Sequence, residues 1–288
     1  MFDYKSIVSD DQLTVDFIAS KFDDKGSVLE YVAKERPSDL EVGIVTIEGS
    51  TFSASNDDIF MQYKLWQTRP ERAVGKKIEI KDKNLEQLIE DYEELFIGSY
   101  IQVNKTHVSP EGPCPYEGAL DWLRSTDFYK CPASTKYHDS FVGGLLVHSL
   151  KVYNKMIDLL KVDDFKSVDV AEATFVSLVH DWCKIGLYES YKRNVKDDKT
   201  GKWHEEPAFK HNQKGVPFGH GVSSMYLASR VSKLSVEQSL AIRWHMGRWD
   251  VSDVQQNELQ LANKTYPIVY LIQFADQLAC TDYGQLSI

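Results

Sequence analysis

Six residues in the C-terminal half of the chain carry side chains that bind transition metals. Each lies on or at the end of a segment with a helical pattern. Imidazole and carboxylate donors together suit divalent first-row ions, and six protein ligands exceed the need of one ion once water takes its share. The sequence therefore predicts a pair of bound ions. The predicted ligands are His148, His180, Asp181, His220, His245 and Asp276.

These residues differ in how much each one indicates by itself. A lone histidine in an apolar helix, such as His148 in GGLLVHSL, is more often a core or surface residue than a ligand. Asp276 indicates more, because a carboxylate inside the apolar run IVYLIQFADQLA is costly to bury unless a cation or hydrogen-bond donors offset it. In the adjacent pair His180 and Asp181, the imidazole can bind one ion while the carboxylate bridges both.

The motifs around these residues resemble those of the HD superfamily of metal-dependent phosphohydrolases. The segment PASTKYHDSFVGGLLVHSLKVY resembles the first-histidine helix of that family, SLVHDWCKIGLY its His-Asp helix and QFADQLA its closing aspartate helix. The histidines of FGHGVSS and AIRWHMG are similar to those of the branch that binds two metals, which includes 3′→5′ exoribonucleases and many bacterial and phage hydrolases. The resemblance covers residues 117–284 and implies an all-helical domain.

The resemblance also implies how the six ligands divide. One ion would be held by His148, His180, Asp181 and Asp276, and the other by Asp181, His220 and His245. The expected ions are two divalent cations, with Mn, Fe, Co, Ni, Zn and Mg all left open. Such a pair lowers the pKa of a shared water, supplies hydroxide and neutralises phosphoryl charge during in-line attack.

Two residues that follow the His-Asp pair are interpreted through the same family pattern. Lys184 keeps the position of the family's lysine and is expected to act in catalysis by directing its charge toward the substrate phosphate. Cys183 stands where the family commonly has glycine, and a packing role is favoured over ligation.

Several further residues are candidates for substrate binding. His138 matches a family position near the substrate, and its alternative is an ordinary loop residue. Arg193 and Lys196 lie in a polar insertion, Tyr191 to Phe209, whose alternative is a solvated loop. Arg243 and Arg248 flank His245 and are candidate anion clamps, although an arginine there often only braces an acidic neighbour. The tryptophans that could stack on a nucleobase, or else pack in the core, are Trp203, Trp244 and Trp249.

The pattern along the chain predicts a mostly α protein of two domains. Residues 113–288 are expected to form the all-helical HD domain, with a capping box at Ser235 and Gln238 and a helix that starts near Pro267. Residues 1–112 are expected to form a smaller α/β or α+β unit of unknown role. Its predicted elements are a helix in Asp10 to Phe22, a strand in Val42 to Ile47 and a charged helix around Asn84 to Leu95. The boundary is placed in the Pro- and Gly-rich stretch from His107 to Pro115.

The amino-acid composition limits the kinds of partner that this protein is expected to bind. The 288 residues carry 33 Lys plus Arg against 43 Asp plus Glu, a net charge of −10, which disfavours nonspecific binding to nucleic acid and favours a small phosphorylated substrate such as a nucleotide. The four cysteines form no C-x-x-C pair, the segment MFDYKSIVSDDQL has no cationic stretch followed by an apolar run, and no segment approaches the roughly 18 apolar residues that a membrane span requires. We therefore expect a cytoplasmic protein with no membrane contact, whose oligomeric state the sequence leaves open.

The leading hypothesis is an enzyme, an HD-type phosphohydrolase that cleaves a phosphoester of a nucleotide or short oligonucleotide. One alternative is a 3′→5′ exonuclease on single strands, which is disfavoured because the charged helix EQLIEDYEEL stands where a basic, strand-rich barrel would be expected. The other alternative is a non-catalytic HD ligand-sensing module, which the complete set of six ligands disfavours.

Overall fold

The computed structural model describes residues 12–14, 43–47, 50–54, 70, 73–104, 115–212 and 218–281. The chain divides into two compact units, Met1–Arg72 and Ala73–Ile288. The described residues are mostly helical, as predicted.

The first unit contains a small mixed sheet with the strand order β1-β2-β3. Its strands are β1 (Gln12–Thr14), β2 (Gly43–Ile47) and β3 (Ser50–Ala54). Strand β1 pairs parallel to β2, and β2 pairs antiparallel to β3. The predicted strand at Val42 to Ile47 is therefore confirmed as β2. The predicted helix at Asp10 to Phe22 is wrong at residues 12–14, where pairing with β2 prevails over local propensity, and its remainder lies outside the described residues.

The division between the two units falls earlier than the expected boundary between residues 112 and 113. Helix α4 (Leu85–Val103), which was assigned to the N-terminal domain, packs against α6 (Gly144–Leu159) and α7 (Val170–Val179) and so belongs to the second unit. Its sequence has the right period for a helix, but periodicity does not say which partner the apolar face covers.

The second unit is built from helices and one hairpin. Short 3-10 turns η3 (Asp163–Phe165), η4 (Trp182–Lys184), η5 (Gly247–Asp250) and η6 (Asp253–Gln255) connect them. The remaining helices are α5 (Pro115–Ser125), α8 (His220–Ser229), α9 (Val236–Arg243), α10 (Gln256–Thr265) and α11 (Pro267–Thr281). The capping box at Ser235 and Gln238 and the helix start at Pro267 are confirmed.

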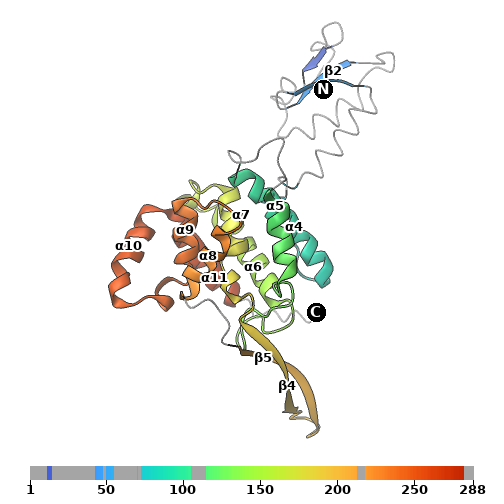
Figure 1. Cartoon of the computed structure of the whole chain (residues 1–288), viewed down its shortest axis with the longest axis vertical. Helices are drawn as coiled ribbons and strands as arrows, with labels where there is room; N and C mark the ends of the chain where they lie inside the picture. The colour runs from blue at the N-terminus through green and yellow to red at the C-terminus, as the bar shows by residue number, and fades with distance from the viewer. Residues whose placement is uncertain are drawn as a thin grey trace. The chain divides into compact units, whose positions relative to one another are not determined.

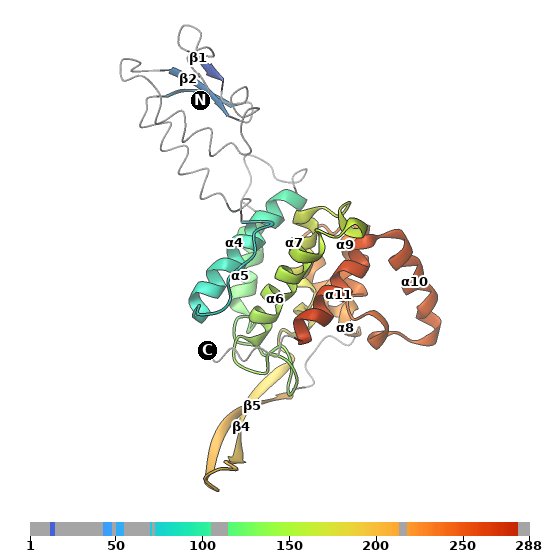
Figure 2. The same ribbon diagram turned by 180° about the vertical axis from the view of Figure 1, so that it is seen from behind.

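Helix α7 lies at the centre of this unit, between its neighbours (Figure 1 and Figure 2). Its residues from Ala173 to Val179 are all buried, so it has no polar face. A helix that is hydrophobic all round requires partners on every side. Contacts with α4, α6, α9 and α11 supply them.

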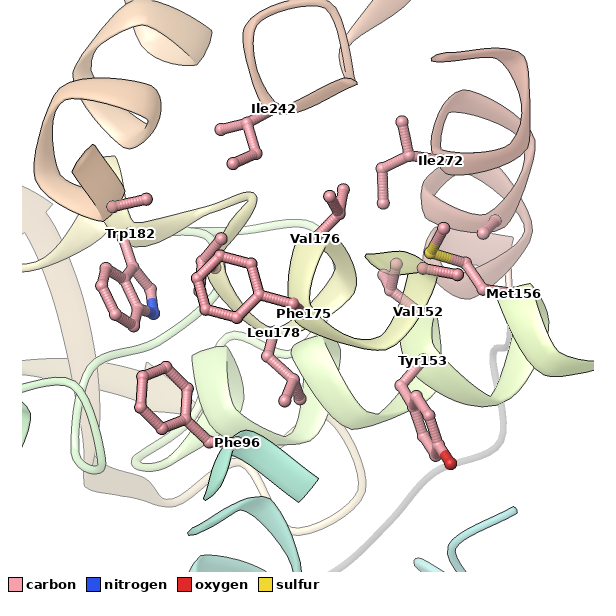
Figure 3. Packing of buried hydrophobic residues seen from close by; sticks show 14 of the residues in the cluster. Phe96, Val152, Tyr153, Met156, Phe175, Val176, Leu178, Trp182, Ile242 and Ile272 are labelled. Atoms are coloured by element: carbon pink, nitrogen blue, oxygen red, sulfur yellow. The ribbon is translucent and has the colours of Figure 1, made fainter. Parts of the chain in front are cut away.

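The core around α7 joins residues that are far apart in the sequence. Figure 3 shows Phe175 and Val176 of α7 among Phe96 of α4, Ile242 of α9 and Ile272 of α11. These side chains are fully buried. Their burial fixes the helices that carry the predicted ligands.

A hydrogen-bond chain connects α4 to the end of α7. The buried Tyr92 hydroxyl donates to the carbonyl oxygen of Leu178 at 2.8 Å and accepts from the indole nitrogen of Trp182 at 3.2 Å. Trp182 also packs against Phe96 and Trp122. The backbone on both sides of His180 and Asp181 is thereby held in place.

The polar insertion at Tyr191 to Phe209 forms most of a β-hairpin, a structure that the sequence analysis did not predict. Strands β4 (Tyr188–Lys196) and β5 (Trp203–His211) pair antiparallel and project from the helices (Figure 1). The strands are mostly exposed to solvent. Among the described helices, none combines the length and apolar character needed to cross a bilayer.

Candidate metal centre

The six predicted ligands come from helices that meet around one point. His148 lies in α6, His180 follows the last residue of α7, and Asp181 precedes η4. The backbone leaves the α conformation at Asp181, with φ −109° and ψ 18°, so these adjacent side chains can face the same space. The other three ligands are His220 at the start of α8, His245 just after α9, and Asp276 in α11.

The two carboxylate oxygens of Asp181 face different imidazoles. Its Oδ2 lies 3.4 Å from Nε2 of His148 and 3.5 Å from Nε2 of His180. Its Oδ1 lies 2.8 Å from Nε2 of His220 and 3.4 Å from Nε2 of His245. Asp181 thus stands between two pairs of histidines, as a bridging carboxylate would.

Asp276 completes the group on the Oδ2 side. Its Oδ1 lies 3.1 Å from Nε2 of His148 and 4.0 Å from Nε2 of His180. The structure therefore brings all six predicted ligands together, although they are spread over the sequence from residue 148 to residue 276.

Backbone carbonyls orient two of the imidazoles from behind. Nδ1 of His180 lies 2.8 Å from the carbonyl oxygen of Ser177, and Nδ1 of His245 lies 2.7 Å from that of Ile242. In each ring the Nδ1–H donates to the carbonyl, which leaves a lone pair on Nε2 directed at Asp181. Metal-binding histidines are typically held by this kind of hydrogen bond.

The centre is buried, and burial and neighbouring charges shift the pKa values of its side chains. Burial alone would raise the pKa of the Asp181 carboxyl, but Lys184, His180 and the hydrogen-bonded His220 together hold that pKa well below its usual range. Nζ of Lys184 donates to Oδ2 of Asp181 at 2.6 Å. Burial lowers the pKa of His180 to about 3, so its ring is neutral and can act as a ligand at physiological pH.

The residues present fit a divalent ion on several counts. Donor atoms of His148, His180 and Asp181 lie within 4.8 Å of one another and are all buried, so they could hold an ion. Nε2 of His245 is buried and has no hydrogen-bond partner within the described part of the chain. Neutral imidazoles combined with carboxylates suit first-row transition ions better than calcium, which prefers oxygen ligands alone.

Two further donor groups lie beside this cluster. Cys183 forms one with Asp181 and His220, but its Sγ is 3.4 Å from Nδ1 and 3.6 Å from Nε2 of His220. A sulfur almost equidistant from both ring nitrogens is aligned with neither lone pair, which favours the packing role. The second group is His138, His148 and Cys280.

A cavity of about 560 Å³ opens onto the centre. Its volume lies in the range of small-molecule sites. Asp181, His220, His245 and Asp276 form part of its wall, together with Lys184. A small molecule bound in the cavity would therefore contact both the predicted metal-binding side chains and the ammonium group of Lys184.

Of the predicted substrate contacts, His138 and the base-stacking candidate Trp249 line this cavity. Burial lowers the pKa of His138 to about 4, with smaller effects from His148 and Lys184. The four predicted basic contacts, Arg193, Lys196, Arg243 and Arg248, are not among the described residues of its wall.

The arginines have other contacts instead. Arg193 lies on exposed β4 and pairs with Glu206 of β5 at 3.4 Å. The guanidinium of Arg243 lies 4.1 Å from the ring centre of the buried Trp244. Arg193 therefore lies in an exposed hairpin, closer to its solvated alternative, and Arg243 packs on an aromatic ring.

Other residues of the cavity wall were not predicted from the sequence. Tyr188 and His211 are paired across the base of the hairpin, and no pattern in the sequence predicts that pairing. Cys280 could have been found, because it lies one helical turn after Asp276 and on the same face of α11. Tyr137, which was not predicted, also lines the cavity, as does the base-stacking candidate Trp249, and 87% and 84% of their surfaces are exposed.

No protein-family model, curated protein or solved structure matches this chain.

Proposed function

We propose that this protein is a phosphohydrolase of the HD type that cleaves a phosphoester of a nucleotide or short oligonucleotide. The observation that carries the proposal is the position of Asp181, whose two oxygens face separate pairs of imidazoles beside an open cavity. The order of the ligand motifs along the chain, which resembles that of the HD superfamily, supports the same conclusion.

Each half of the centre would hold one cation. His148, His180 and Asp276 would bind on the Oδ2 side of Asp181, and His220 and His245 on the Oδ1 side. When bound, the pair of cations would activate a water molecule and neutralise charge on the phosphoryl oxygens.

The chain's own residues would position the substrate. Asp181 charge-pairs with Lys184, which lines the cavity and can turn an ammonium hydrogen toward a phosphate oxygen. Burial would lower the pKa of the Lys184 ammonium, but Asp181 raises it above its usual value, so the group stays charged throughout the physiological range. A fixed positive charge at this point favours a phosphorylated ligand over a neutral one.

The aromatic side chains at the cavity support a nucleotide as the substrate. Tyr137 and Trp249 line the same wall as Lys184, yet both are largely exposed. A nucleobase can stack on such rings while its phosphate reaches the buried centre.

The test is a screen for phosphate release with and without each of the six candidate metals. Nucleotides, cyclic nucleotides and short single-stranded oligonucleotides should be offered to the purified protein. We expect metal-dependent cleavage of at least one of them and its loss in Asp181→Ala, because that change removes a ligand from both ions. The exposed hairpin residue Asp198 provides the control Asp198→Ala, which should remain active.

Other results of the screen would reject the proposal. Stepwise removal of mononucleotides from long single strands, with nucleotides and short oligonucleotides untouched, would indicate an exonuclease. Stoichiometric metal with no cleavage of any phosphoester would indicate a ligand-sensing module. Activity retained in Asp181→Ala would rule out the centre described above.

A further inference from the structure

Asp139, which no motif of the sequence analysis singled out, lies directly behind the predicted ligand His148. Its side chain is only 5% exposed. Its Oδ1 accepts a hydrogen bond from Nζ of Lys151 at 2.7 Å, and its Oδ2 lies 3.9 Å from Nδ1 of His148. His148 and Lys151 are three residues apart on α6 and so share a face of the helix. One carboxylate thus pairs with Lys151 through one oxygen and faces the ring of His148 with the other.

The atoms of Asp139 and His148 that face each other have no other partner. Nδ1 of His148 and Oδ2 of Asp139 are both buried, and neither has a hydrogen-bond partner within the described residues. Leaving a buried polar group unsatisfied costs about 1–3 kcal/mol. A ring N–H and a carboxylate oxygen are complementary, so each is the natural partner of the other.

His148 differs in this respect from the two other fully buried imidazoles. His180 and His245 are held from behind by backbone carbonyls, those of Ser177 and Ile242. Behind His148 there is a carboxylate instead. A charged acceptor both selects the tautomer with hydrogen on Nδ1 and makes Nε2 a stronger donor to a metal.

The backbone around Asp139 is built to keep it there. Asp139 has a φ of +47°, a left-handed conformation that non-glycine residues rarely adopt. Its carbonyl oxygen accepts a hydrogen bond from the backbone N–H of Ala133 at 3.1 Å. A Cβ at Gly144 would come within 1.9 Å of that oxygen, so only glycine permits this approach at the start of α6. Strain of this kind persists where the surrounding structure fixes it, and it concentrates at functional sites.

We infer that Asp139 is a positioning residue for the metal centre: its carboxylate accepts the Nδ1–H of His148 and so directs Nε2 of that ring at the ion on the Oδ2 side of Asp181. This inference rests on the proposed metal centre. It assigns a role to a residue that contacts neither the ion nor the substrate.

The test compares zinc binding by the wild type and two variants of the full chain, by calorimetric titration of metal-free protein. Asp139→Gly removes the carboxylate and suits the left-handed backbone, and Asp139→Asn keeps the shape and an acceptor oxygen. Loss of such an outer partner typically weakens metal binding about 10- to 100-fold. We expect that loss at one of two sites in Asp139→Gly, a smaller loss at the same site in Asp139→Asn, and no change at the other site.

A matched control separates this role from the ion pair. Lys151→Met removes the partner of Oδ1 but leaves the carboxylate facing His148, so zinc affinity should stay within about 3-fold of the wild type. If Lys151→Met weakened zinc binding as much as Asp139→Gly, the ion pair would explain the effect and the inference would be wrong. Equal weakening of both sites in Asp139→Gly would likewise indicate general damage to the fold.

A spectroscopic measurement reports on the hydrogen bond itself. In zinc-loaded protein labelled with ¹⁵N-histidine, the Nδ1–H of His148 should give a proton resonance that is absent from Asp139→Gly and from His148→Gln. Presence of that resonance in Asp139→Gly would overturn the inference. If the wild type bound neither zinc nor any other of the six candidate metals, the proposed centre itself would fail, whereas two zinc ions bound with unchanged affinity in Asp139→Gly would overturn only the role of Asp139.

Discussion

Lys184 is the residue whose role can be separated most cleanly from metal binding. It charge-pairs with Asp181 but belongs to the cavity wall and offers no ligand atom. We predict that Lys184→Ala keeps its metal content and lowers kcat/KM for the substrate by about 100-fold, the usual effect of removing one fixed donor from a transition state. Metal analysis and steady-state kinetics on the same preparation check this. Unchanged kinetics would remove Lys184 from the site.

Trp249 tests whether the substrate carries a base. Stacking of a base on an aromatic ring is worth about 1–3 kcal/mol, so Trp249→Ala should raise KM for a nucleotide by about 5- to 150-fold. Hydrolysis of ribose 5-phosphate, which has no base, should not change. Trp203 offers a matched control, because it is 68% exposed on β5 and is not part of the described cavity wall. If Trp203→Ala had the same effect, base stacking at the cavity would be refuted.

Between elements, a charged clamp joins α4 to α5. Nε and Nη2 of Arg124 donate to the two oxygens of Glu93 at 2.9 and 2.6 Å, and the Tyr129 hydroxyl donates to Glu93 at 2.9 Å. The hydrogen bond from Arg124 lowers the pKa of Glu93, burial partly opposes this, and Tyr129 lowers it further. Because the pKa of Glu93 is lower in the folded than in the unfolded protein, the clamp stabilises the fold fully at pH values above the unfolded-state pKa. That stabilisation is lost as the pH falls through the folded-state pKa.

The clamp therefore predicts a pH-dependent effect of Glu93→Gln. Because Arg124 is half exposed, the loss in unfolding free energy should be only about 1 kcal/mol at pH 7. The loss should begin to shrink as the pH falls below about 4.3, the usual glutamate pKa, and should vanish only once the pH lies below the lowered pKa of Glu93 in the folded state. Urea denaturation at pH 7 and at acidic pH measures this difference in unfolding free energy, with Glu94→Gln as the exposed control. A difference that persisted at low pH would show that charge is not the cause.

Close packing of α8 against the end of α9 predicts a second effect between elements. A Cβ at Gly221 would lie 1.9 Å from the carbonyl oxygen of Arg243, so Gly221→Ala must push the two backbones apart. Since His220 and His245 lie beside these residues, we expect loss of the ion on the Oδ1 side and about 1–3 kcal/mol of destabilisation.

Gly118 provides the control for that prediction. It lies within α5, and an added Cβ would meet nothing within 4 Å. Gly118→Ala should be neutral or stabilise by about 0.5–1 kcal/mol, because alanine favours a helix more than glycine does. Metal content measured together with thermal unfolding separates the two variants, and full metal content in Gly221→Ala would contradict the prediction.

Elements with local signals were the ones predicted correctly. The capping box at Ser235 marks the start of α9 on its own, and Pro267 marks the start of α11. The hairpin β4–β5 had no such signal, because its polar strands lack the alternation of a half-buried sheet. The strand β1 was taken for helix because three residues that pair with a distant strand carry little local information.

The same distinction applies to the centre. Residue type, order and family resemblance were enough to select the six side chains that the structure brings together. Arg243 and Arg248 were selected by nearness in sequence to His245, and Arg193 and Lys196 by their place in a polar insertion. In the structure, Arg193 and Arg243 contact other residues. Asp139 was missed because its relation to His148 depends on a left-handed turn that brings its carboxylate behind the ring.

At the scale of the whole molecule, the centre should stabilise the fold when it is loaded. Four imidazoles and two carboxylates face one another, and all but His220 are almost completely buried. An ion present at 100 times its Kd adds about 2.7 kcal/mol. For a unit of this size we predict that chelation lowers Tm by about 5–10 °C for each ion removed.

Thermal unfolding of the full chain with and without a chelator measures this effect. Asp181→Ala, which is expected to bind no ion, should melt at the same temperature in both conditions. A chelator that left the Tm of the wild type unchanged would mean that no ion is bound to the folded protein.

The central position of α7 places the His-Asp pair in the core, and the other ligands lie on or beside helices that come before and after it in the sequence. The first ligand is residue 148 and the last is residue 276, so a polypeptide interrupted anywhere before α11 lacks an essential carboxylate. Affinity for the metal pair should thus arise only once α11 has been synthesised. Nascent chains and degradation fragments would compete poorly for scarce ions, which would be reserved for intact molecules.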